Sequence, residues 1–490
     1  MLFSELLKKA DIVFQGLFDA EAEDIVYDSR KARAGTVFVA LRGAKTDGHR
    51  FVCSAYAQGC RMFVCEDEQS LPEDAAVVYV RDTSEALAQL SAAFFDFPAK
   101  KLKLIGITGT KGKTTTAYII RHILEKNGRR AGMIGSLGVY YADKYIHTAN
   151  TTPESYLLHK YFAQMSACGT EYCVMEVSSQ AYLCKRVFGI TFDIGVFTNL
   201  YRGDHIGPGE CRDFDHYREC KGNLPACSHL SVINADDEYA PYFLSRAAGQ
   251  TVTYGMNNPA DLTAYAQSLW KEKSSFGISF TVAGEGGRVK VSSRIPGRYS
   301  IYNILAAFAV CSRLGLTYEQ CAKSVRDCSV KGRFETVDAL PWCTCIVDFA
   351  HNDVSLRNVL TAVREYEPER LIVLFGSVGG RTELRRGAMG RVAAELADFA
   401  VITSDDPDFE DPMKIASDIE KGLGNLPHEV ISDRRRAVEW TLRNSRAGDV
   451  IVFAGKGHQD YDLVRGKKLP YDERKTIEEC AAHLREGAKL

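Results

Sequence analysis

The sequence predicts an α/β protein of about three domains, and three features of the 490-residue chain support this fold class. Short apolar runs alternate with amphipathic stretches along most of the chain, as in mostly parallel sheets covered by helices. One apolar run leads into a Gly-rich turn and then a helix-like stretch, and four later runs each end in a polar loop. We expect domains at residues 1–103, 104–332 and 333–490.

Composition and charge exclude several classes of protein. The chain is 46% hydrophobic and 25% charged, which is typical of soluble globular proteins. Because the formal net charge is only −2, we expect no nucleic-acid partner. No run of about 18 apolar residues occurs, so we expect no membrane span and a cytoplasmic protein. We also expect a monomer. The fifteen cysteines are scattered, which favours reduced, buried thiols.

The first expected domain, residues 1–103, has short strand-like segments at residues 36–40 and 76–80. The same domain contains two polar segments, Tyr27-Asp-Ser-Arg30 before the first strand-like segment and Lys45-Thr-Asp-Gly-His49 after it. Strand-like segments this short predict a small α/β unit.

The second expected domain opens with Ile105-Gly-Ile-Thr-Gly-Thr-Lys-Gly-Lys-Thr-Thr-Thr116. Its glycines let the backbone approach an oxyanion, Lys113 supplies a point charge for phosphates, and the hydroxyl of Thr114 or Thr115 can reach Mg²⁺. Residues 116–127 then have helical periodicity. The segment is a variant P-loop, because Ile107 stands where the common signature has glycine. It predicts binding of ATP or GTP.

Further apolar runs of this domain, at residues 172–177, 194–197 and 230–233, predict parallel strands. Glu176 lies near the end of the first run, where a carboxylate is costly without a metal or a cation. Asp204 and His205 follow the second run. These residues are candidate partners of Mg²⁺.

The third expected domain has probable strands at residues 345–347, 371–375, 399–403 and 450–453. Each strand runs into a polar loop, at residues 348–352, 376–381, 404–408 and 455–460 respectively. Ligands of open α/β sheets bind at the carboxyl ends of the strands, so we expect a small-molecule site there.

These motifs resemble the Mur ligases, and most closely the MurE type, over nearly the whole chain. The motifs that carry the resemblance are Asp28-Ser-Arg30, Asp47-Gly-His49, Thr108 to Thr115, Asn150-Thr-Thr152, Glu176-Val-Ser-Ser179, Asn199, Asp204-His205, Gly332-Arg333, Asp348-Phe-Ala-His351 and Gly455-Lys-Gly-His458. The resemblance implies a small α/β N-terminal nucleotide-sugar-binding domain, a central P-loop ATPase-like parallel sheet and a C-terminal Rossmann-like domain.

The resemblance also implies a set of site residues. ATP would be bound by Thr110, Lys111, Gly112, Lys113, Thr114, Thr115, Asn303, Arg333 and Asp348. Mg²⁺ would be bound by Thr114, Glu176, His205 and Lys221, the last as N6-carboxylysine. The catalytic residues would be Lys113, Glu176, His205 and Lys221.

The implied reaction joins an amino acid to UDP-N-acetylmuramoyl-L-alanyl-D-glutamate in peptidoglycan precursor synthesis. ATP would convert the free side-chain carboxylate of the glutamate into an acyl phosphate, which an amino group attacks. The resemblance implies that the UDP-substrate contacts Ser29, Thr151, Thr152, Ser178 and Arg186.

The identity of the added amino acid depends on departures from the family pattern. The implied contacts are Arg381, Asp405, Asp406, Asp408, Gly455 and Gln459. Enzymes that add meso-diaminopimelate usually carry Asp-Asn-Pro-Arg where this chain has Asp405-Asp-Pro-Asp408, and glutamate where it has Gln459. An aspartate in place of that arginine would repel a distal carboxylate, whereas an ammonium group would suit Asp406 and Asp408. We therefore expect L-lysine, or L-ornithine, to be added.

Other interpretations stay open at this stage. Asp408 could face solvent and select nothing, with meso-diaminopimelate as the substrate. Another Mur-like amide ligase, of the folate-polyglutamylating or cyanophycin type, would not need the Asp28-Ser-Arg30 segment. A P-loop switch protein would not need the small-molecule site of the third domain.

Overall fold

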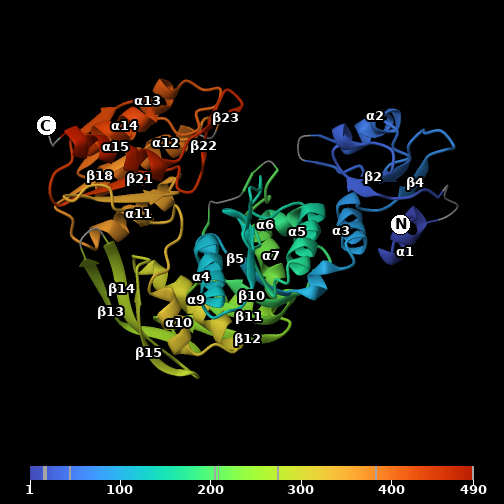
Figure 1. The fold of residues 1–490 in the computed structure, drawn as a ribbon, viewed down its shortest axis with the longest axis horizontal. Coiled ribbons are helices and arrows are strands. Elements are labelled where there is room, and N and C mark those ends of the chain that lie inside the picture. The colour runs from blue at the N-terminus through green and yellow to red at the C-terminus, as the bar shows by residue number, and fades with distance from the viewer. Residues whose placement is uncertain are drawn as a thin grey trace. The chain divides into compact units, whose positions relative to one another are not determined.

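The structure is a computed structural model that describes residues 1–14, 19–43, 46–202, 206–207, 209–272, 275–380 and 383–487 (Figure 1). The chain forms two compact units, Met1–Thr263 with Tyr302–Thr317, and Ala264–Ile301 with Tyr318–Leu490. Among the described residues, none of the helices combines the length and the apolar character that a membrane crossing requires.

The N-terminal part of the first unit is a four-stranded, all-parallel sheet in the order β1-β2-β3-β4. Residues of α1 and α3 form one core with this sheet, and residues of α2 contribute to another. The elements are α1 (Phe3–Lys9), β1 (Asp24–Val26), η1 (Ser29–Lys31), β2 (Thr36–Val39), η2 (Gly48–Phe51), α2 (Val52–Ala57), β3 (Met62–Cys65), β4 (Ala76–Tyr79), α3 (Thr83–Phe94) and η3 (Pro98–Lys101).

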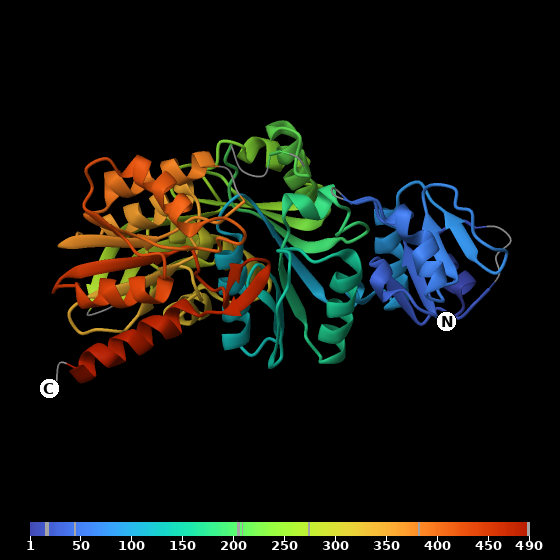
Figure 2. The same ribbon diagram turned by 90° about the horizontal axis from the view of Figure 1, so that it is seen from above.

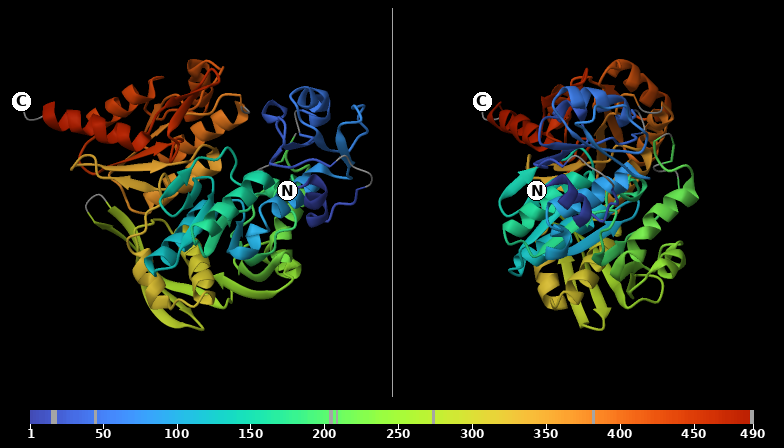
Figure 3. Two further views of the ribbon diagram at one scale, coloured as in Figure 1. Left: turned by 45° about the vertical axis from the view of Figure 1, so that its right-hand side comes forward. Right: turned by 90° about the vertical axis from the view of Figure 1, so that its right-hand side faces the viewer.

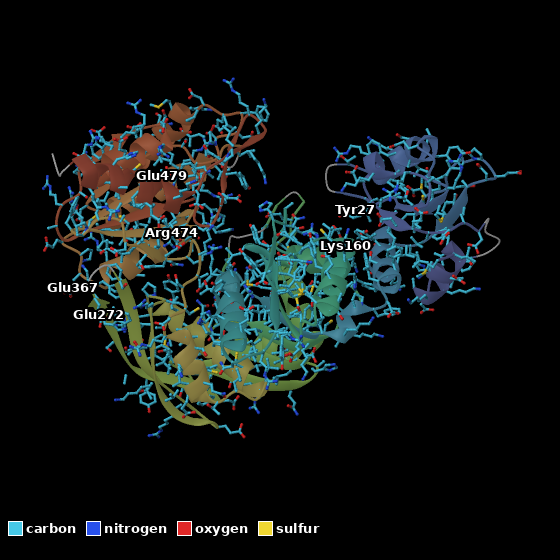
Figure 4. All side chains as sticks on the ribbon, in the orientation of Figure 1. Tyr27, Lys160, Glu272, Glu367, Arg474 and Glu479 are labelled. Atoms are coloured by element: carbon cyan, nitrogen blue, oxygen red, sulfur yellow. The ribbon has the colours of Figure 1, made fainter. Side chains whose placement is uncertain are left out.

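This sheet is joined to the rest of the first unit through α5 (Ser155–Ala167), which packs on α3. The hydroxyl of Tyr156 on α5 donates a hydrogen bond to Asp24 of β1. Tyr27 and Lys160, both labelled in Figure 4, contact the ring of Tyr156. The ring centroids of Tyr27 and Tyr156 are 6.4 Å apart, and the ammonium group of Lys160 lies 5.8 Å from the Tyr156 centroid. Tyr156 therefore belongs to the core of the N-terminal sheet.

The main sheet of the first unit has the strand order β12-β11-β10-β5-β9-β6-β7-β8. Its strands are parallel except in the β6-β7-β8 meander. The strands are β5 (Lys103–Thr108), β6 (Ala131–Gly135), β7 (Gly138–Tyr141), β8 (Lys144–Ile146), β9 (Tyr172–Glu176), β10 (Phe192–Phe197), β11 (Ser228–Asn234) and β12 (Gln250–Gly255). The other helices are α4 (Lys113–Lys126), α6 (Ser179–Leu183), α7 (Phe214–Ala226) and α8 (Ala240–Arg246).

The second unit begins with a group of long strands that the sequence analysis did not predict. They are β13 (Leu262–Glu272), β14 (Ser275–Gly284) and β15 (Gly287–Ser293), drawn in yellow-green in the left panel of Figure 3. Strands β14 and β15 are antiparallel, and α10 (Tyr318–Val325) packs on β15. The helix α9 (Tyr299–Arg313) has only its first residues in this unit.

The C-terminal sheet has the order β16-β17-β21-β18-β19-β20 and is parallel except for β16. Figure 2 shows helices on both of its faces, with α12 and α13 on one side and α14 and α15 on the other. The strands are β16 (Glu335–Val337), β17 (Thr344–Asp348), β18 (Arg370–Phe375), β19 (Phe399–Ile402), β20 (His428–Val430) and β21 (Asp449–Ala454), and the hairpin strands β22 (Tyr461–Val464) and β23 (Lys467–Pro470) follow. The helices are α11 (Asp353–Arg364), α12 (Glu383–Leu396), α13 (Pro412–Leu423), α14 (Arg434–Arg443) and α15 (Glu473–Gly487).

The expected α/β class is confirmed, and the expected strands occur at the predicted places to within two residues. The parallel arrangement brings the carboxyl ends of β17, β18, β19 and β21 to one edge of the C-terminal sheet. The domain boundaries at residues 103 and 332 stay predictions, because the two compact units of the structure begin and end at other residues.

One buried titratable group sets a pH dependence for folding. His159 on α5 is 2% exposed, and among the described residues neither of its ring nitrogens has a hydrogen-bond partner. Burial lowers the pKa of His159 to about 4. The pKa of a histidine in an unfolded chain is about 6.5. Between this pKa and that of the folded protein, the unfolded chain binds the proton more tightly than the folded chain does.

We therefore expect the stability that neutral His159 permits to be complete above about pH 6.5 and to be lost as the pH falls toward 4. The free energy of unfolding should fall between pH 7 and pH 5 by about 2 kcal/mol less in His159→Leu than in the wild type. Urea unfolding at both pH values measures this difference. The same substitution at the exposed His229 is the control, and an unchanged pH dependence in His159→Leu would contradict the assignment.

Candidate functional site

The P-loop lies between β5 and α4, and two glycines shape it. Gly109 and Gly112 have φ values of 144° and 83°, which L-residues rarely adopt. A Cβ at Gly109 would lie 2.0 Å from the hydroxyl of Thr198, and one at Gly112 would lie 2.4 Å from Oδ1 of Asn303. Only glycine therefore fits at these two positions.

Glu176, at the end of β9, is the carboxylate at the centre of this region. It is 1% exposed, its Oε2 accepts a hydrogen bond of 3.0 Å from the hydroxyl of Thr114, and its Oε1 accepts one of 2.7 Å from the backbone N–H of Ser136. The side chain thus links the first turn of α4 to the loop after β6. A hydroxyl and a carboxylate are the hard oxygen donors that Mg²⁺ prefers, so these residues fit the expected ion.

Two lysines converge on one carbonyl oxygen of the P-loop. Lys113 Nζ donates to Gly109 O at 2.8 Å, and Lys221 Nζ of α7 donates to the same oxygen at 2.7 Å. Lys221 is 1% exposed and lies 4.7 Å from the centroid of the Tyr217 ring. Two ammonium groups this close repel each other, which favours an anion beside the loop.

The other expected ATP residues of the first unit also lie around the P-loop. The hydroxyl of Thr110 contacts the hydroxyl of Tyr217 at 3.1 Å, and the backbone N–H of Lys111 donates to Asn199 at 2.9 Å. The side chain of Asn303, on α9, accepts a hydrogen bond of 3.2 Å from Thr116. Thr115 lies in the first turn of α4.

Four of the five residues expected to contact the UDP-substrate form one cluster beside Glu176. Thr152 Oγ1 donates to the backbone oxygen of Glu176 at 2.8 Å and lies 3.3 Å from Ser178 Oγ. Arg186 donates to the backbone oxygen of Thr152 at 3.2 Å, and Thr151 Oγ1 lies 3.0 Å from Ser136 Oγ. The fifth residue, Ser29, lies on η1 of the N-terminal sheet, where its backbone oxygen accepts from Gln58.

Arg333 and Asp348, the remaining residues expected to contact ATP, belong to the second unit. The guanidinium carbon of Arg333 lies 4.8 Å from the centroid of the Phe349 ring, and Asp348 Oδ2 accepts the backbone N–H of Phe334 at 2.7 Å. Desolvation raises the pKa of Asp348 above its ordinary value, although the charge of Arg333 opposes this shift. The two side chains thus influence each other electrostatically.

Asp405, one of the residues expected to bind the amino acid, lies in the loop after β19, at the carboxyl edge of the C-terminal sheet. Asp405 is 2% exposed, and among the described residues its Oδ2 has no hydrogen-bond partner. A Cβ at Gly455 would lie 2.3 Å from this oxygen, and one at Gly376 would lie 2.9 Å from Cβ of Asp405. Glycines after β18 and β21 therefore allow the close packing of this carboxylate.

A fully buried lysine, Lys456, pairs with the neighbouring acids. Its Nζ lies 2.5 Å from Asp406 Oδ1, 2.6 Å from Asp462 Oδ1 and 3.5 Å from Asp405 Oδ1. Burial alone would lower the pKa of Lys456, but the three carboxylates outweigh this effect and raise it. Asp406 therefore already has a cationic partner within the protein.

Asp408 also has partners within the protein. Its Oδ1 accepts the backbone N–H of Gly466 at 2.6 Å, in the turn of the β22–β23 hairpin. The amide of Gln459 lies 3.5 Å from the hydroxyl of Tyr461, at the start of the same hairpin. Asp204, His205 and Arg381, which were also expected in the site, lie outside the described residues.

The sequence analysis gave no role to Ser136, Tyr217, Lys456 or Asp462, which the structure places among the expected site residues. Ser136 directly follows β6, so its position at a strand end was a usable signal. Lys456 lies inside the Gly455-Lys-Gly-His458 motif. Asp462 had no signal, because its contact with Asp406 depends on the hairpin's fold.

Comparisons with known proteins match almost all of the chain. Residues 22–95 match the catalytic domain of the Mur ligase family, residues 107–311 the Mur ligase middle domain, and residues 332–457 the Mur ligase glutamate ligase domain. The chain is 37% identical over 485 residues to the UDP-N-acetylmuramoyl-L-alanyl-D-glutamate–2,6-diaminopimelate ligase of Caldanaerobacter subterraneus subsp. tengcongensis, covering 98% of this chain and 99% of that protein. It is also 37% identical to the Clostridium perfringens protein of the same name, covering 97% and 99% of the two chains.

Solved structures show the same fold over the whole length. A UDP-N-acetylmuramoyl-L-alanyl-D-glutamate–2,6-diaminopimelate ligase is similar with a TM-score of 0.69 and 24% identity, covering 98% of this chain and 99% of that chain. MurF of Thermotoga maritima in complex with ADP is similar with a TM-score of 0.62 and 18% identity, covering 95% and 98% of the two chains. The three-domain α/β architecture expected from the sequence is thus confirmed, and the chain belongs to the Mur ligase family of ATP-dependent ligases in peptidoglycan synthesis, as a MurE-type member.

Proposed function

We propose that this protein uses ATP to add meso-diaminopimelate to UDP-N-acetylmuramoyl-L-alanyl-D-glutamate. The observation that carries the proposal is 37% identity over 98% of the chain to a ligase named for these two substrates. The amino acid differs from the lysine or ornithine that we expected from the sequence. A cytoplasmic location and a monomeric state stay predictions.

The reason for favouring lysine was that Asp406 and Asp408 would attract an ammonium group. Asp406 instead pairs with Lys456, and Asp408 accepts the backbone N–H of Gly466. Carboxylates that already have partners offer little to a substrate cation. The relatives and these contacts both support diaminopimelate over lysine.

In the proposed ATP site, the P-loop amides and Lys113 hold the phosphates, and Thr110, Lys111, Gly112 and Thr115 line the loop. The side chain of Asn303 lies close to Gly112 of the loop, so we assign Asn303 to the nucleotide. Arg333 and Asp348 are assigned to the same ligand. Thr114, Glu176 and His205 would hold Mg²⁺, which supplies charge stabilisation at the transferred phosphoryl group.

Lys221 is proposed to act as a carbamate. Its ammonium group shares the Gly109 carbonyl oxygen with Lys113. Conversion of Lys221 to N6-carboxylysine would replace this repelling cation with an anionic oxygen donor, which suits a second Mg²⁺. Bicarbonate labelled with ¹³C would report the modification.

The proposed acceptor contacts are Thr151, Thr152, Ser178 and Arg186, with Ser29 assigned to the UDP part. A carboxylate is a poor acylating agent, so transfer of a phosphoryl group from ATP to the glutamate side chain comes first. The amino group of diaminopimelate then attacks the carbonyl carbon of the acyl phosphate. The tetrahedral intermediate releases inorganic phosphate as the amide forms.

The amino acid is assigned to Arg381, Asp405, Gly455 and Gln459. Asp406 and Asp408 are proposed to shape the loop that holds it.

Substrate preference is the first test of the proposal. With ATP and UDP-N-acetylmuramoyl-L-alanyl-D-glutamate present, phosphate release should require an amino acid, and kcat/KM should be highest for meso-diaminopimelate. L-lysine and L-ornithine are assayed in parallel, and the product mass identifies which one was joined. Phosphate release that needs no amino acid would instead favour a nucleotide-dependent switch. Preference for lysine would restore the expectation from the sequence.

The role of Glu176 gives a second test. Glu176→Gln keeps an oxygen for the Ser136 N–H but removes the charge, so we expect kcat to fall by about a hundredfold or more. The thermal midpoint should change little, and a higher Mg²⁺ concentration should restore part of the rate. Glu171→Gln, just before the other end of β9, is the matched control. Equal kcat values for both variants would refute the role.

A further inference from the structure

Asp408 fastens the turn of the β22–β23 hairpin to the loop after β19. Its backbone N–H donates to Leu463 O at 3.0 Å, and its backbone oxygen accepts the N–H of Arg465 at 2.8 Å. Its carboxylate accepts the N–H of Gly466 at 2.6 Å. Asp408 therefore uses both its main chain and its side chain to hold Arg465 and Gly466 beside the 405–408 loop.

The hairpin has two distinct faces. Asp462 on β22 bonds Lys456 at 2.6 Å and accepts the N–H of Asp406 at 3.2 Å, so its face is turned toward the 405–408 loop. Val464 pairs with Lys467, and alternation along the strands places Lys467 on the face of Asp462. Lys468 lies on the opposite face, where its ammonium group is 3.9 Å from the centroid of the Tyr461 ring.

The buried cations of this region are committed to partners within the protein. Lys456 is surrounded by Asp405, Asp406 and Asp462. Arg434 pairs with Glu473 at 2.7 Å and donates to two backbone oxygens. Arg465 and Lys467 are exposed, and within the part of the chain that the structure describes neither side chain has an ion pair or a hydrogen bond. Their charges are available to a dissolved anion.

We propose that Arg465 and Lys467 at the tip of the β22–β23 hairpin bind the distal carboxylate of diaminopimelate. This inference rests on the proposed function, because lysine has an ammonium group and no carboxylate at that end. The 405–408 loop contributes three carboxylates and no cation, so a dicarboxylate substrate needs positive charge from elsewhere. Asp408 supplies it indirectly, because it positions the hairpin that carries the two cations.

Steady-state kinetics of Arg465→Ala, Lys467→Ala and the double variant test the proposal. We expect the double variant to raise KM for meso-diaminopimelate by about ten- to hundredfold with little change in kcat. The kinetics of L-lysine, measured as a substrate or as a competitive inhibitor, should stay at the wild-type values. Lys468→Ala removes the same charge from the opposite face of the hairpin and should leave both amino acids unaffected.

The outcomes separate this inference from the proposed function. If the wild-type enzyme joins diaminopimelate and the double variant has an unchanged KM for it, only the hairpin assignment is overturned. An equal effect of Lys468→Ala, or an equal loss for lysine, would also overturn it, because general electrostatics or a damaged fold would then explain the result. A wild-type enzyme that joins only lysine would overturn both the hairpin assignment and the proposed function.

Asp408→Asn, which keeps an acceptor for the N–H of Gly466, should retain most of the wild-type affinity for diaminopimelate.

Discussion

One buried carboxylate organises the phosphate-binding end of the first unit. Burying a charge costs several kcal/mol unless hydrogen bonds or a cation compensate for it. Glu176 obtains this compensation from the Thr114 hydroxyl and the Ser136 N–H. Its backbone oxygen also accepts from Thr152. The loops after β5, β6 and β8 are thus held to the end of β9, and the proposed phosphate, metal and acceptor residues come within reach of one another.

The same constraint recurs in the second unit with the opposite sign. Here a buried cation, Lys456, requires carboxylates around it, and Asp405, Asp406 and Asp462 come from two different segments. Arg434 and Glu473 form a second buried pair, and Arg434 also bonds the backbone oxygens of Ser404 and Ala454. At the same end of α15, Arg474, labelled in Figure 4, pairs with Glu335 of β16 at 2.5 Å. The loops that are proposed to bind the amino acid are therefore joined to one another by ion pairs and hydrogen bonds within the protein.

Much of this organisation could be predicted from the sequence, because it follows from local patterns. The apolar runs at residues 172–177 and 371–375 indicated their strands, and parallel strands bring their polar carboxyl ends together. Strands β13 and β15 were missed, because their partly exposed, polar residues lack a continuous apolar run. Strand β14 was missed because its buried apolar residues alternate with small or polar ones. The Lys221 contact with Gly109 O was also beyond local patterns, since the two residues are far apart in the sequence.

The amino-acid preference shows why a single substitution is hard to interpret without its surroundings. An aspartate at position 408 suggests attraction of a cation when it is considered alone. In the structure its carboxylate caps a hairpin turn, where Arg465 and Gly466 have positive φ values of 49° and 74°. A turn of this kind leaves its N–H groups without strand partners, and an adjacent carboxylate satisfies one of them. The hydrogen bond that Asp408 accepts from Gly466 thus stabilises the conformation that presents Arg465, so an acidic residue in the loop is compatible with an acidic substrate.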